Sequence, residues 1–259
     1  MTKKILITGA NGQLGHEMRN ALKGNNRFEC IFTDVAELDI CNTEAVKQTM
    51  ANNHIDYIVN CAAYTQVDKA EDNAELCKKI NTDAVENLAR AAADYGARMI
   101  HISTDYVFNG RGYRPYTEDM VPDPQSVYGS TKLEGEKILT DICPESIIIR
   151  TAWLYSPYGN NFVKTMLHLG EEREELSVVA DQIGTPTCAA DLAQAILVIL
   201  QADTFVPGTY HFSDEGVCSW YDFTVTIHRL AGIAMNIPVK HTDLFTASSI
   251  KVKLKKHTG

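Results

Sequence analysis

The sequence predicts an α/β fold with a doubly wound parallel sheet and a smaller lobe toward the C-terminus. Three observations support this prediction. Short apolar segments recur along the first 150 residues, segments of helical periodicity alternate with them, and this alternation becomes looser afterwards. A short continuous apolar segment is typical of a strand buried on both faces. Strands that alternate with helices indicate a parallel sheet with right-handed crossovers.

The first 150 residues supply most of the expected elements. We expect strands at residues 5–7, 28–32, 57–59, 99–102 and 147–149, where the chain is apolar or strand-like, and helices at 14–22, 43–50 and 74–95, where apolar residues recur at helical spacing. Residues 109–127 contain three prolines and two glycines, which predicts a loop. Loops beside the carboxyl ends of parallel strands are where this fold class binds ligands.

The chain after Arg150 predicts the smaller lobe. Helices are expected at 162–172, 191–200 and 221–231, and a strand at 176–179. We therefore expect a main domain over residues 1–150 and a lobe over residues 151–259. The lobe offers the additional surface that a substrate needs, so we expect it to bind substrate.

Composition excludes several classes of protein. Lys and Arg number 24 against 33 Asp and Glu, and the net charge of -9 argues against a nucleic-acid partner. The seven cysteines are scattered without a C-x-x-C pair, which indicates reduced thiols. No apolar segment is long enough to span a bilayer. We expect a cytoplasmic protein without a membrane partner.

A glycine-rich turn follows the first predicted strand and precedes the first predicted helix. It consists of Gly9, Ala10, Asn11, Gly12, Gln13, Leu14 and Gly15. Such a turn needs positive φ, lets the backbone approach a pyrophosphate and directs the N–H groups of the helix at the anion. The pattern predicts a Rossmann dinucleotide-binding domain over residues 1–150, although a glycine turn without a ligand is the alternative.

Three later positions extend the predicted cofactor site. Asp34 follows the second strand, where a carboxylate can accept from a ribose 2′-OH and so favours NAD(H) over NADP(H). A solvated acid at the strand end is the alternative. Asp39 and Ile40 lie where the next loop would reach the adenine. The small residues of 61–63 (Cys61, Ala62 and Ala63) would let the backbone lie along the cofactor, or serve close packing alone.

The segment Tyr128-Gly129-Ser130-Thr131-Lys132 predicts the catalytic pair. At i and i+4 of a helix, Tyr128 and Lys132 share one face. A neighbouring ammonium favours the phenolate, so the tyrosine gives up its proton more readily to a developing alkoxide. Thr104 follows the fourth strand, where its hydroxyl can hydrogen-bond the reacting oxygen. A solvated pair and a simple turn residue are the alternatives.

Together these features resemble the extended short-chain dehydrogenases/reductases that act on nucleotide sugars, and within them the dTDP-4-dehydrorhamnose reductases. The supporting stretches are residues 60–71, 103–108, 150–155, 181–187 and 219–223. The resemblance implies reduction, by NADPH or NADH, of the C4 ketone of dTDP-6-deoxy-L-lyxo-4-hexulose (dTDP-4-dehydro-L-rhamnose). The product, dTDP-L-rhamnose, would serve cell-surface polysaccharide synthesis.

The resemblance also assigns roles to residues. It makes Tyr128 the proton donor, and Lys132 the residue that tunes it and holds the nicotinamide ribose. It places Thr104 and Asp105 on the sugar and packs Trp153 against the substrate. The cofactor would be lined by Gly12, Gln13, Leu14, Asp34, Asp39, Ile40, Ala63, Tyr64 and Thr65.

The C-terminal segment departs from the family pattern. The family continues with a segment of the type Y-P-x-x-A-x-R-P-x-x-S-x-L, whereas residues 243–256 contain neither proline nor arginine. We expect a truncated or frame-shifted tail with solvated lysines, which would affect substrate binding more than cofactor binding. Some family members hold a metal at a subunit contact, but position 190 is Ala190 here. We expect no catalytic metal, and a homodimer is compatible with the resemblance.

Two other functions remain open from the sequence. A nucleotide-sugar dehydratase or epimerase would use the same tyrosine and lysine while retaining its nicotinamide. A dehydratase is expected to carry an acidic residue after Thr104-Asp105, where this chain has Tyr106. A non-catalytic nucleotide-binding regulatory subunit is favoured by the altered tail and disfavoured by the intact Tyr128 and Lys132.

Overall fold

The computed structural model describes residues 2–233, 235–236 and 249–254, and the chain divides into two compact units. The first unit comprises residues 1–151 and 189–212, and the second comprises residues 152–188 and 213–259. The expected single boundary at residue 150 does not describe this division. Helix α8 (Ala189–Gln201) packs against α1 (Gln13–Ala21), and strand β10 (Gly208–His211) joins the main sheet, so residues 189–212 return to the first unit.

Six parallel strands form the sheet of the first unit, in the order β10-β5-β4-β3-β1-β2. Their bounds are β1 (Lys3–Thr8), β2 (Phe28–Thr33), β3 (Tyr57–Asn60), β4 (Arg98–Thr104) and β5 (Ile147–Thr151). The strand after β2 lies on the opposite side of β1, so the order reverses between β1 and β3. Open α/β sheets bind ligands at such a switch point. The predicted doubly wound parallel sheet is confirmed.

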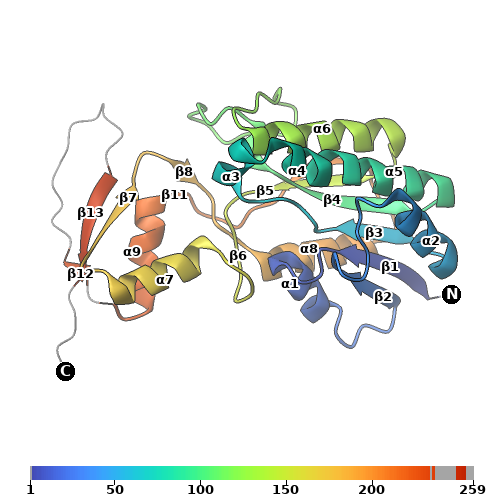
Figure 1. Ribbon diagram of the computed structural model, residues 1–259. Coiled ribbons are helices and arrows are strands. Elements are labelled where there is room, and N and C mark those ends of the chain that lie inside the picture. Colours follow the sequence, from blue (N-terminus) through green and yellow to red (C-terminus); the bar gives the residue numbers. More distant parts are fainter. Residues whose placement is uncertain (1, 234, 237–248, 255–259) are drawn as a thin grey trace. The chain divides into compact units, whose positions relative to one another are not determined.

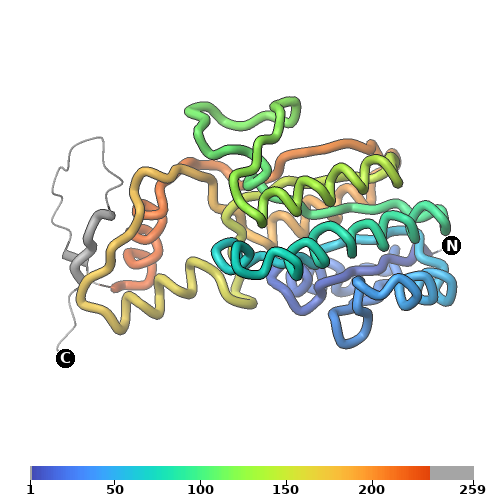
Figure 2. The backbone as a smooth tube through the Cα atoms, turned by 45° about the horizontal axis from the view of Figure 1, so that its top comes forward, coloured from blue at the N-terminus to red at the C-terminus, as the bar shows by residue number. Residues whose placement is uncertain are grey.

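Helices cover both faces of this sheet (Figure 1 and Figure 2). Helices α1 and α8 pack together on one face, and α2 (Thr43–Asn53), α5 (Ala84–Tyr95) and α6 (Val127–Ile142) lie in a row on the other. The short helices α3 (Val67–Asp72) and α4 (Ala74–Lys78) contact α6. A single 3₁₀ turn (Asp105–Val107) follows β4, and residues 108–126 form the expected loop.

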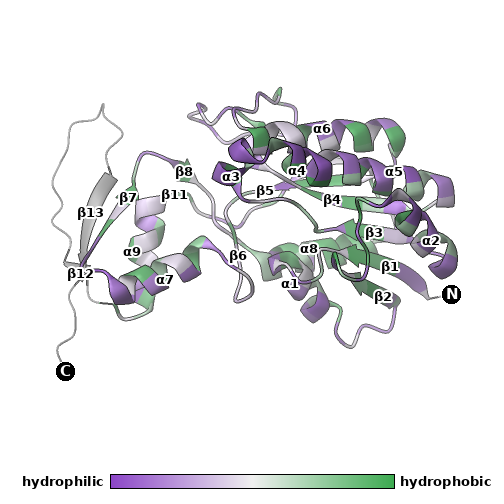
Figure 3. Cartoon of the chain, in the orientation of Figure 1, coloured by the Kyte–Doolittle hydropathy of each residue, from purple (hydrophilic) through white to green (hydrophobic). Residues whose placement is uncertain are grey.

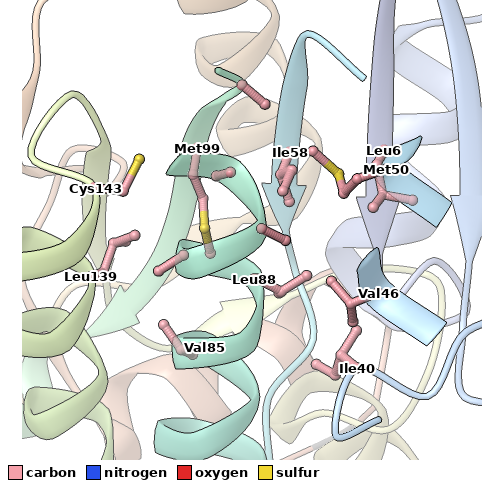
Figure 4. Close-up of a cluster of buried hydrophobic side chains, with 14 of the residues drawn as sticks. Leu6, Ile40, Val46, Met50, Ile58, Val85, Leu88, Met99, Leu139 and Cys143 are labelled. Carbon is pink, nitrogen blue, oxygen red and sulfur yellow. The ribbon is translucent and has the colours of Figure 1, made fainter. Parts of the chain in front are cut away.

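Apolar side chains from the sheet and from these helices form the core (Figure 4). Leu6, Ile58 and Met99 of the strands belong to one cluster with Leu88 of α5 and Leu139 of α6, and all five are 0% exposed. Burial of each such side chain stabilises the fold by about 1.5–3 kcal/mol. Figure 3 shows the strands as largely apolar and the helices as mixed, which is the pattern of a sheet enclosed by amphipathic helices.

The helix predicted over residues 74–95 is interrupted by one π-helical turn, Lys79–Asp83, between α4 and α5. Asn81 lies in this turn and is 1% exposed. Helix α6 approaches it at Gly135, where an added Cβ would overlap the Asn81 carbonyl oxygen. The absence of a side chain at Gly135 therefore allows α6 to lie against the turn.

The second unit contains short strands and two longer helices. Its elements are β6 (Leu154–Tyr155), α7 (Phe162–Glu172), β7 (Glu175–Val179), β8 (Ile183–Gly184), β9 (Thr187–Cys188), β11 (Cys218–Ser219), α9 (Trp220–Leu230), β12 (Met235–Asn236) and β13 (Ser249–Leu254). Met166 of α7 and Ile227 of α9 share a small core with Leu176 and Val178 of β7. The capping box of Ser219 and Asp222 fixes the start of α9.

Part of the C-terminal segment is a strand. Residues 249–254 form β13, which pairs antiparallel with β7 and with β12, and the expectation that its lysines are solvated stays a prediction. Its alternating lysines and apolar residues match the period of a strand. Residues 243–248 and 255–256 of the expected tail lie outside the described residues.

The contact between Gly135 and the π-helical turn gives the first testable prediction. Alanine has a higher helix propensity than glycine by about 1 kcal/mol, so an unhindered Gly135→Ala exchange would stabilise α6. Because the new methyl group meets backbone, we expect a net loss of about 1–3 kcal/mol in the free energy of unfolding. Urea unfolding measures it, with Lys137→Ala on the exposed face of α6 as the control. A more stable Gly135→Ala protein would contradict this packing argument.

Candidate active site

The glycine turn lies at the switch point between β1 and β3. Gly9 has φ +64°, and a Cβ there would lie 2.6 Å from the backbone nitrogen of Ala62. A Cβ on Gly15 would overlap the Gly9 carbonyl oxygen. The Gly12 N–H donates to that same oxygen at 3.0 Å, and α1 begins immediately after Gly12. The positive end of α1 therefore faces a tight turn made of backbone, which suits a pyrophosphate.

A cavity of about 580 Å³ lies beside this turn. It is lined by the predicted residues Gly9, Asn11, Gly12, Asp34, Asp39, Ile40, Cys61, Ala62 and Ala63. It is also lined by Val35, Leu38, Cys41, Leu76, Lys79 and Ile80, which the sequence analysis missed. Val35 and Leu76 are 72% and 48% exposed, so the cavity carries apolar side chains that the core does not cover.

Seven of the predicted cofactor residues do not line this cavity. They are Gln13, Leu14, Gly15, Tyr64, Thr65, Tyr128 and Lys132. Leu14 and Gly15 are buried in α1, where they pack the helix against the turn. Tyr64 is held by Asn81, whose side chain accepts from the Tyr64 N–H at 2.9 Å and donates to its carbonyl at 3.1 Å. The π-helical turn thus fixes the backbone that follows Ala63, a role that no local sequence pattern indicates.

Asp34 connects β2 to the glycine turn. One carboxylate oxygen accepts from the Asn11 N–H at 2.9 Å, and the other accepts from the Val35 N–H at 2.8 Å. The Asp34 N–H in turn donates to the Glu37 carboxylate at 2.9 Å. The carboxylate is therefore fixed in the wall of the cavity, and it also holds the turn in place.

The predicted catalytic pair lies at the start of α6. The Ser126 hydroxyl accepts from the Gly129 N–H at 3.1 Å and caps this helix. Tyr128 is 8% exposed, and its ring meets the Tyr106 ring edge-on at 5.5 Å between centroids. Burial raises the pKa of the Tyr128 phenol, whereas its hydrogen bond with the Thr104 hydroxyl opposes that rise. The structure thus brings Thr104 and Tyr128 together.

Lys132 lies one turn along α6 and is 1% exposed. Its side-chain nitrogen lies 2.7 Å from the Ile102 carbonyl oxygen and 3.2 Å from His101 Nε2. Burial lowers the pKa of Lys132 to about 8, while the charges of Glu136 and Cys77 oppose that fall. His101 was missed by the sequence analysis. A polar residue inside the apolar strand 99–102 is the signal that could have identified it.

Asp105 occupies the end of β4 beside the tyrosine. Burial raises its pKa to about 6, against hydrogen bonds from the Thr104 hydroxyl at 3.1 Å and from the N–H groups of Asp105 and Tyr106. A carboxyl group with this pKa holds a proton for part of the time at neutral pH. Asp105 is therefore suited to contact a polar sugar hydroxyl in either role, as donor or acceptor.

Trp153 lies in the second unit, in an aromatic cluster. Its backbone has φ +48°, and its ring stacks on Trp220 with centroids 3.4 Å apart and an interplanar angle of 12°. Gly184 leaves space for the ring, and the Thr187 N–H donates to the Trp153 carbonyl at 3.2 Å. Residues 150–155, 181–187 and 219–223, three of the stretches that carry the family resemblance, therefore meet at Trp153. The contact of Trp153 with substrate stays a prediction.

Among residues 2–233, 235–236 and 249–254, no group of three or more His, Cys, Asp and Glu side chains is arranged to hold a metal ion. No helix within them is long and apolar enough to cross a membrane. The expectation that the reaction uses no catalytic metal stays a prediction.

The raised pKa of Asp105 predicts a pH-dependent stability. Because the folded protein binds this proton more tightly than the unfolded chain, the buried carboxylate destabilises the fold above about pH 6 and ceases to do so below about pH 4. Asp105→Asn should therefore raise the free energy of unfolding by about 1–3 kcal/mol at pH 8 and change it little at pH 4. Urea unfolding at both pH values measures this, with the exposed Asp141→Asn as control. A gain that is equal at the two pH values would refute it.

Comparisons with known proteins agree with this geometry. The sequence model of the family described as "RmlD substrate binding domain" matches residues 3–249. The dTDP-4-dehydrorhamnose reductase of Escherichia coli (strain K12) is 45% identical over 242 residues, which cover 89% of this chain and 80% of that protein.

Two solved structures have the same fold. A dTDP-4-dehydrorhamnose reductase from Clostridium acetobutylicum has a TM-score of 0.87 and 49% identity, covering 95% of this chain and 86% of that one. The Bacillus anthracis dTDP-4-dehydrorhamnose reductase, solved in complex with NADP, has a TM-score of 0.88 and 42% identity. The match covers 96% of this chain and 88% of that one. The match of the family model over most of the chain, with these identities, shows that the chain belongs to the RmlD substrate-binding-domain family, that of the dTDP-4-dehydrorhamnose reductases.

Proposed function

We propose that the chain reduces the C4 ketone of dTDP-4-dehydro-L-rhamnose to dTDP-L-rhamnose with NADPH or NADH. The observation that supports this best is the group of Thr104, Tyr128 and Lys132 at the carboxyl end of β4 and the start of α6, in a chain of this family. The same unit carries the glycine-lined cavity. The product would be used for cell-surface polysaccharide.

The residues of the cavity fit a dinucleotide. The turn at Gly12 and the positive end of α1 would hold the pyrophosphate, and the fixed carboxylate of Asp34 would accept from the adenosine ribose. Asp39 and Ile40, with the exposed side chain of Val35, would surround the adenine. The volume of about 580 Å³ lies in the range of small-molecule sites. When bound, the reduced nicotinamide would supply the hydride.

Tyr128 would donate the proton in this reaction. Because burial raises the pKa of its phenol, Tyr128 holds a proton at neutral pH and can transfer it to the oxygen of the reduced ketone. The Thr104 hydroxyl, already hydrogen-bonded to the phenol, would orient that oxygen. Lys132 would contact the nicotinamide ribose, and Asp105 the sugar. In the second unit, Trp153 would offer an aromatic face to the substrate.

A nucleotide-sugar dehydratase or epimerase is the main alternative. Such enzymes return the hydride, so they show no net oxidation of the nicotinamide. Tyr106 follows Asp105 and places an aromatic ring, rather than a second carboxylate, against Tyr128. This favours the reductase. A regulatory subunit would bind nucleotide without turnover, which the same assay distinguishes.

We also propose a homodimer and a cytoplasmic location, as the family resemblance suggests. The acidic balance of the chain, 24 basic against 33 acidic residues, supports the proposal that nucleic acid is not a partner. The dTDP-sugar is the small-molecule partner.

Loss of the Tyr128 hydroxyl should stop turnover while preserving cofactor binding. Tyr128→Phe removes the donated proton and should lower kcat by about 10²- to 10⁴-fold. Absorbance at 340 nm follows NADPH or NADH oxidation in the presence of the dTDP-4-keto sugar. Tyr57→Phe, the same exchange at the opposite end of the sheet, serves as control. Oxidation without the keto sugar, or full activity of Tyr128→Phe, would contradict the proposal.

The charge of Asp34 should set the preference between the two cofactors. Asp34→Asn keeps an acceptor for the Asn11 N–H but removes the charge that repels a 2′-phosphate. We expect the ratio of kcat/KM for NADPH to that for NADH to rise about tenfold. The exposed Asp119→Asn, in the loop 108–126, is the control. An unchanged ratio would mean that Asp34 only holds the turn.

A further inference from the structure

A row of buried polar side chains connects the first strand with the catalytic lysine. It runs from Thr8 of β1 through Asn60 of β3 and His101 of β4 to Lys132 of α6, and none of the four is more than 1% exposed. The distances are 2.7 Å from Thr8 Oγ1 to Asn60 Oδ1, 3.0 Å from Asn60 Nδ2 to His101 Nδ1, and 3.2 Å from His101 Nε2 to Lys132 Nζ. The parallel register places Thr8, Asn60 and His101 side by side.

A backbone group fixes the direction of these hydrogen bonds. The Ala62 N–H can only donate, and it donates to the Asn60 side chain at 3.2 Å, so the amide oxygen must face it. The amide nitrogen then faces His101 and donates to Nδ1. A neutral imidazole that accepts at Nδ1 carries its proton on Nε2. That proton lies toward Lys132.

We propose that His101 is a positioning residue that favours the unprotonated amine form of Lys132 in the ligand-free protein, because the His101 Nε2–H needs an acceptor and the lysine nitrogen is the group it meets. An ammonium has three donors and no acceptor, so it would set two donors against each other at 3.2 Å. An amine accepts from His101 and still donates to the Ile102 carbonyl at 2.7 Å.

Protonation of Lys132 therefore requires a change elsewhere in the row. The imidazole must move its proton to Nδ1, which then faces the Asn60 NH₂ group, or Asn60 must turn and leave the Ala62 N–H unpaired. The titratable groups that face Lys132 are His101 from β4, Cys77 from α4 and Glu136 from its own helix. Cys77 and Glu136 favour the ammonium, whereas burial and His101 oppose it.

This arrangement links the charge of the lysine to the wall of the cavity. Ala62 lines that cavity, and its N–H also fixes the orientation of the Asn60 amide and so the direction of the hydrogen bonds from Asn60 to Lys132. A ligand that displaces the Ala62 backbone would therefore change the proton affinity of Lys132. The kinetic consequence rests on the proposed function, whereas the protonation state of the ligand-free protein does not.

Nitrogen NMR of the ligand-free, ¹⁵N-labelled protein tests the protonation state directly. Above the lowered Lys132 pKa of about 8, we expect His101 Nδ1 to show the shift of an unprotonated nitrogen, Nε2 that of a protonated one, and Lys132 Nζ that of an amine. The opposite tautomer in that pH range, with the Nε2 lone pair facing an ammonium, would overturn the proposal. This measurement needs neither substrate nor turnover, so it decides the matter even if the proposed function is wrong.

Two variants should place a hydrogen-bond acceptor, in place of the His101 Nε2–H donor, opposite Lys132. In Asn60→Asp the carboxylate accepts from the Ala62 N–H and from Nδ1–H, so Nε2 becomes an acceptor. In His101→Gln the amide oxygen can face Lys132 without any added charge. In both variants the Lys132 ammonium no longer faces the Nε2–H donor of His101. We therefore expect the pKa of Lys132 to rise by about one to two units in both. Ser103→Ala, a buried hydroxyl on β4 without a hydrogen-bond partner in the described structure, is the matched control.

The kinetic counterpart is the pH dependence of kcat in the reductase assay. In the profile of kcat against pH, the limb near pH 8 should shift by the same amount as the Lys132 pKa measured by NMR in Asn60→Asp and His101→Gln. It should not shift in Ser103→Ala. A merely structural role would lower kcat or stability without moving the limb, and that outcome would overturn the proposal. If NMR shows the shift and no reductase activity exists in any variant, the proposed function fails and the positioning role stands.

Discussion

The close contact between the turn after β1 and the backbone after β3 is the constraint on which the site depends. Gly9 reaches its positive φ and its approach to Ala62 only because it lacks a side chain, and Gly15 brings α1 onto the same turn. These contacts lie where the strand order reverses, so the cavity opens at the switch point. Asp34 then ties the turn to β2, and Asn60 ties the backbone after β3 to β4.

Burial of charge on α6 has to be offset by specific partners. Glu136 accepts from Arg150 through two nitrogens, at 3.0 and 2.7 Å, and this ion pair fixes α6 to β5 one turn beyond Lys132. Removing one partner of such a buried pair costs about 3–5 kcal/mol, so the pair holds the helix that carries Tyr128 and Lys132. The π-helical turn at Asn81 packs on the same helix at Gly135.

The sequence was sufficient for the elements that periodicity and turn chemistry determine. The glycine turn, strands β1 to β5 and β7, and helix α7 lie where they were expected, because each depends on neighbouring residues alone. Return of β10 and α8 to the first unit, the π-helical turn and the partners of Lys132 were not predicted. They depend on contacts between distant segments, such as Asn81 with Tyr64 and His101 with Asn60, and local pattern carries little information about these. His101 could have been noticed as a polar residue within an apolar strand.

The buried face of α6 presents three titratable groups at successive turns, and their surroundings give them different freedom. Tyr128 is kept neutral by burial, so it arrives at the reaction with its proton. Glu136 is committed to its ion pair with Arg150. Lys132 hydrogen-bonds two neutral groups, an imidazole and a carbonyl, whose hydrogen-bond directions favour the amine over the ammonium. The lysine is therefore the group whose charge can change within the fold, and the row through His101 and Asn60 makes that change depend on the backbone that lines the cofactor cavity.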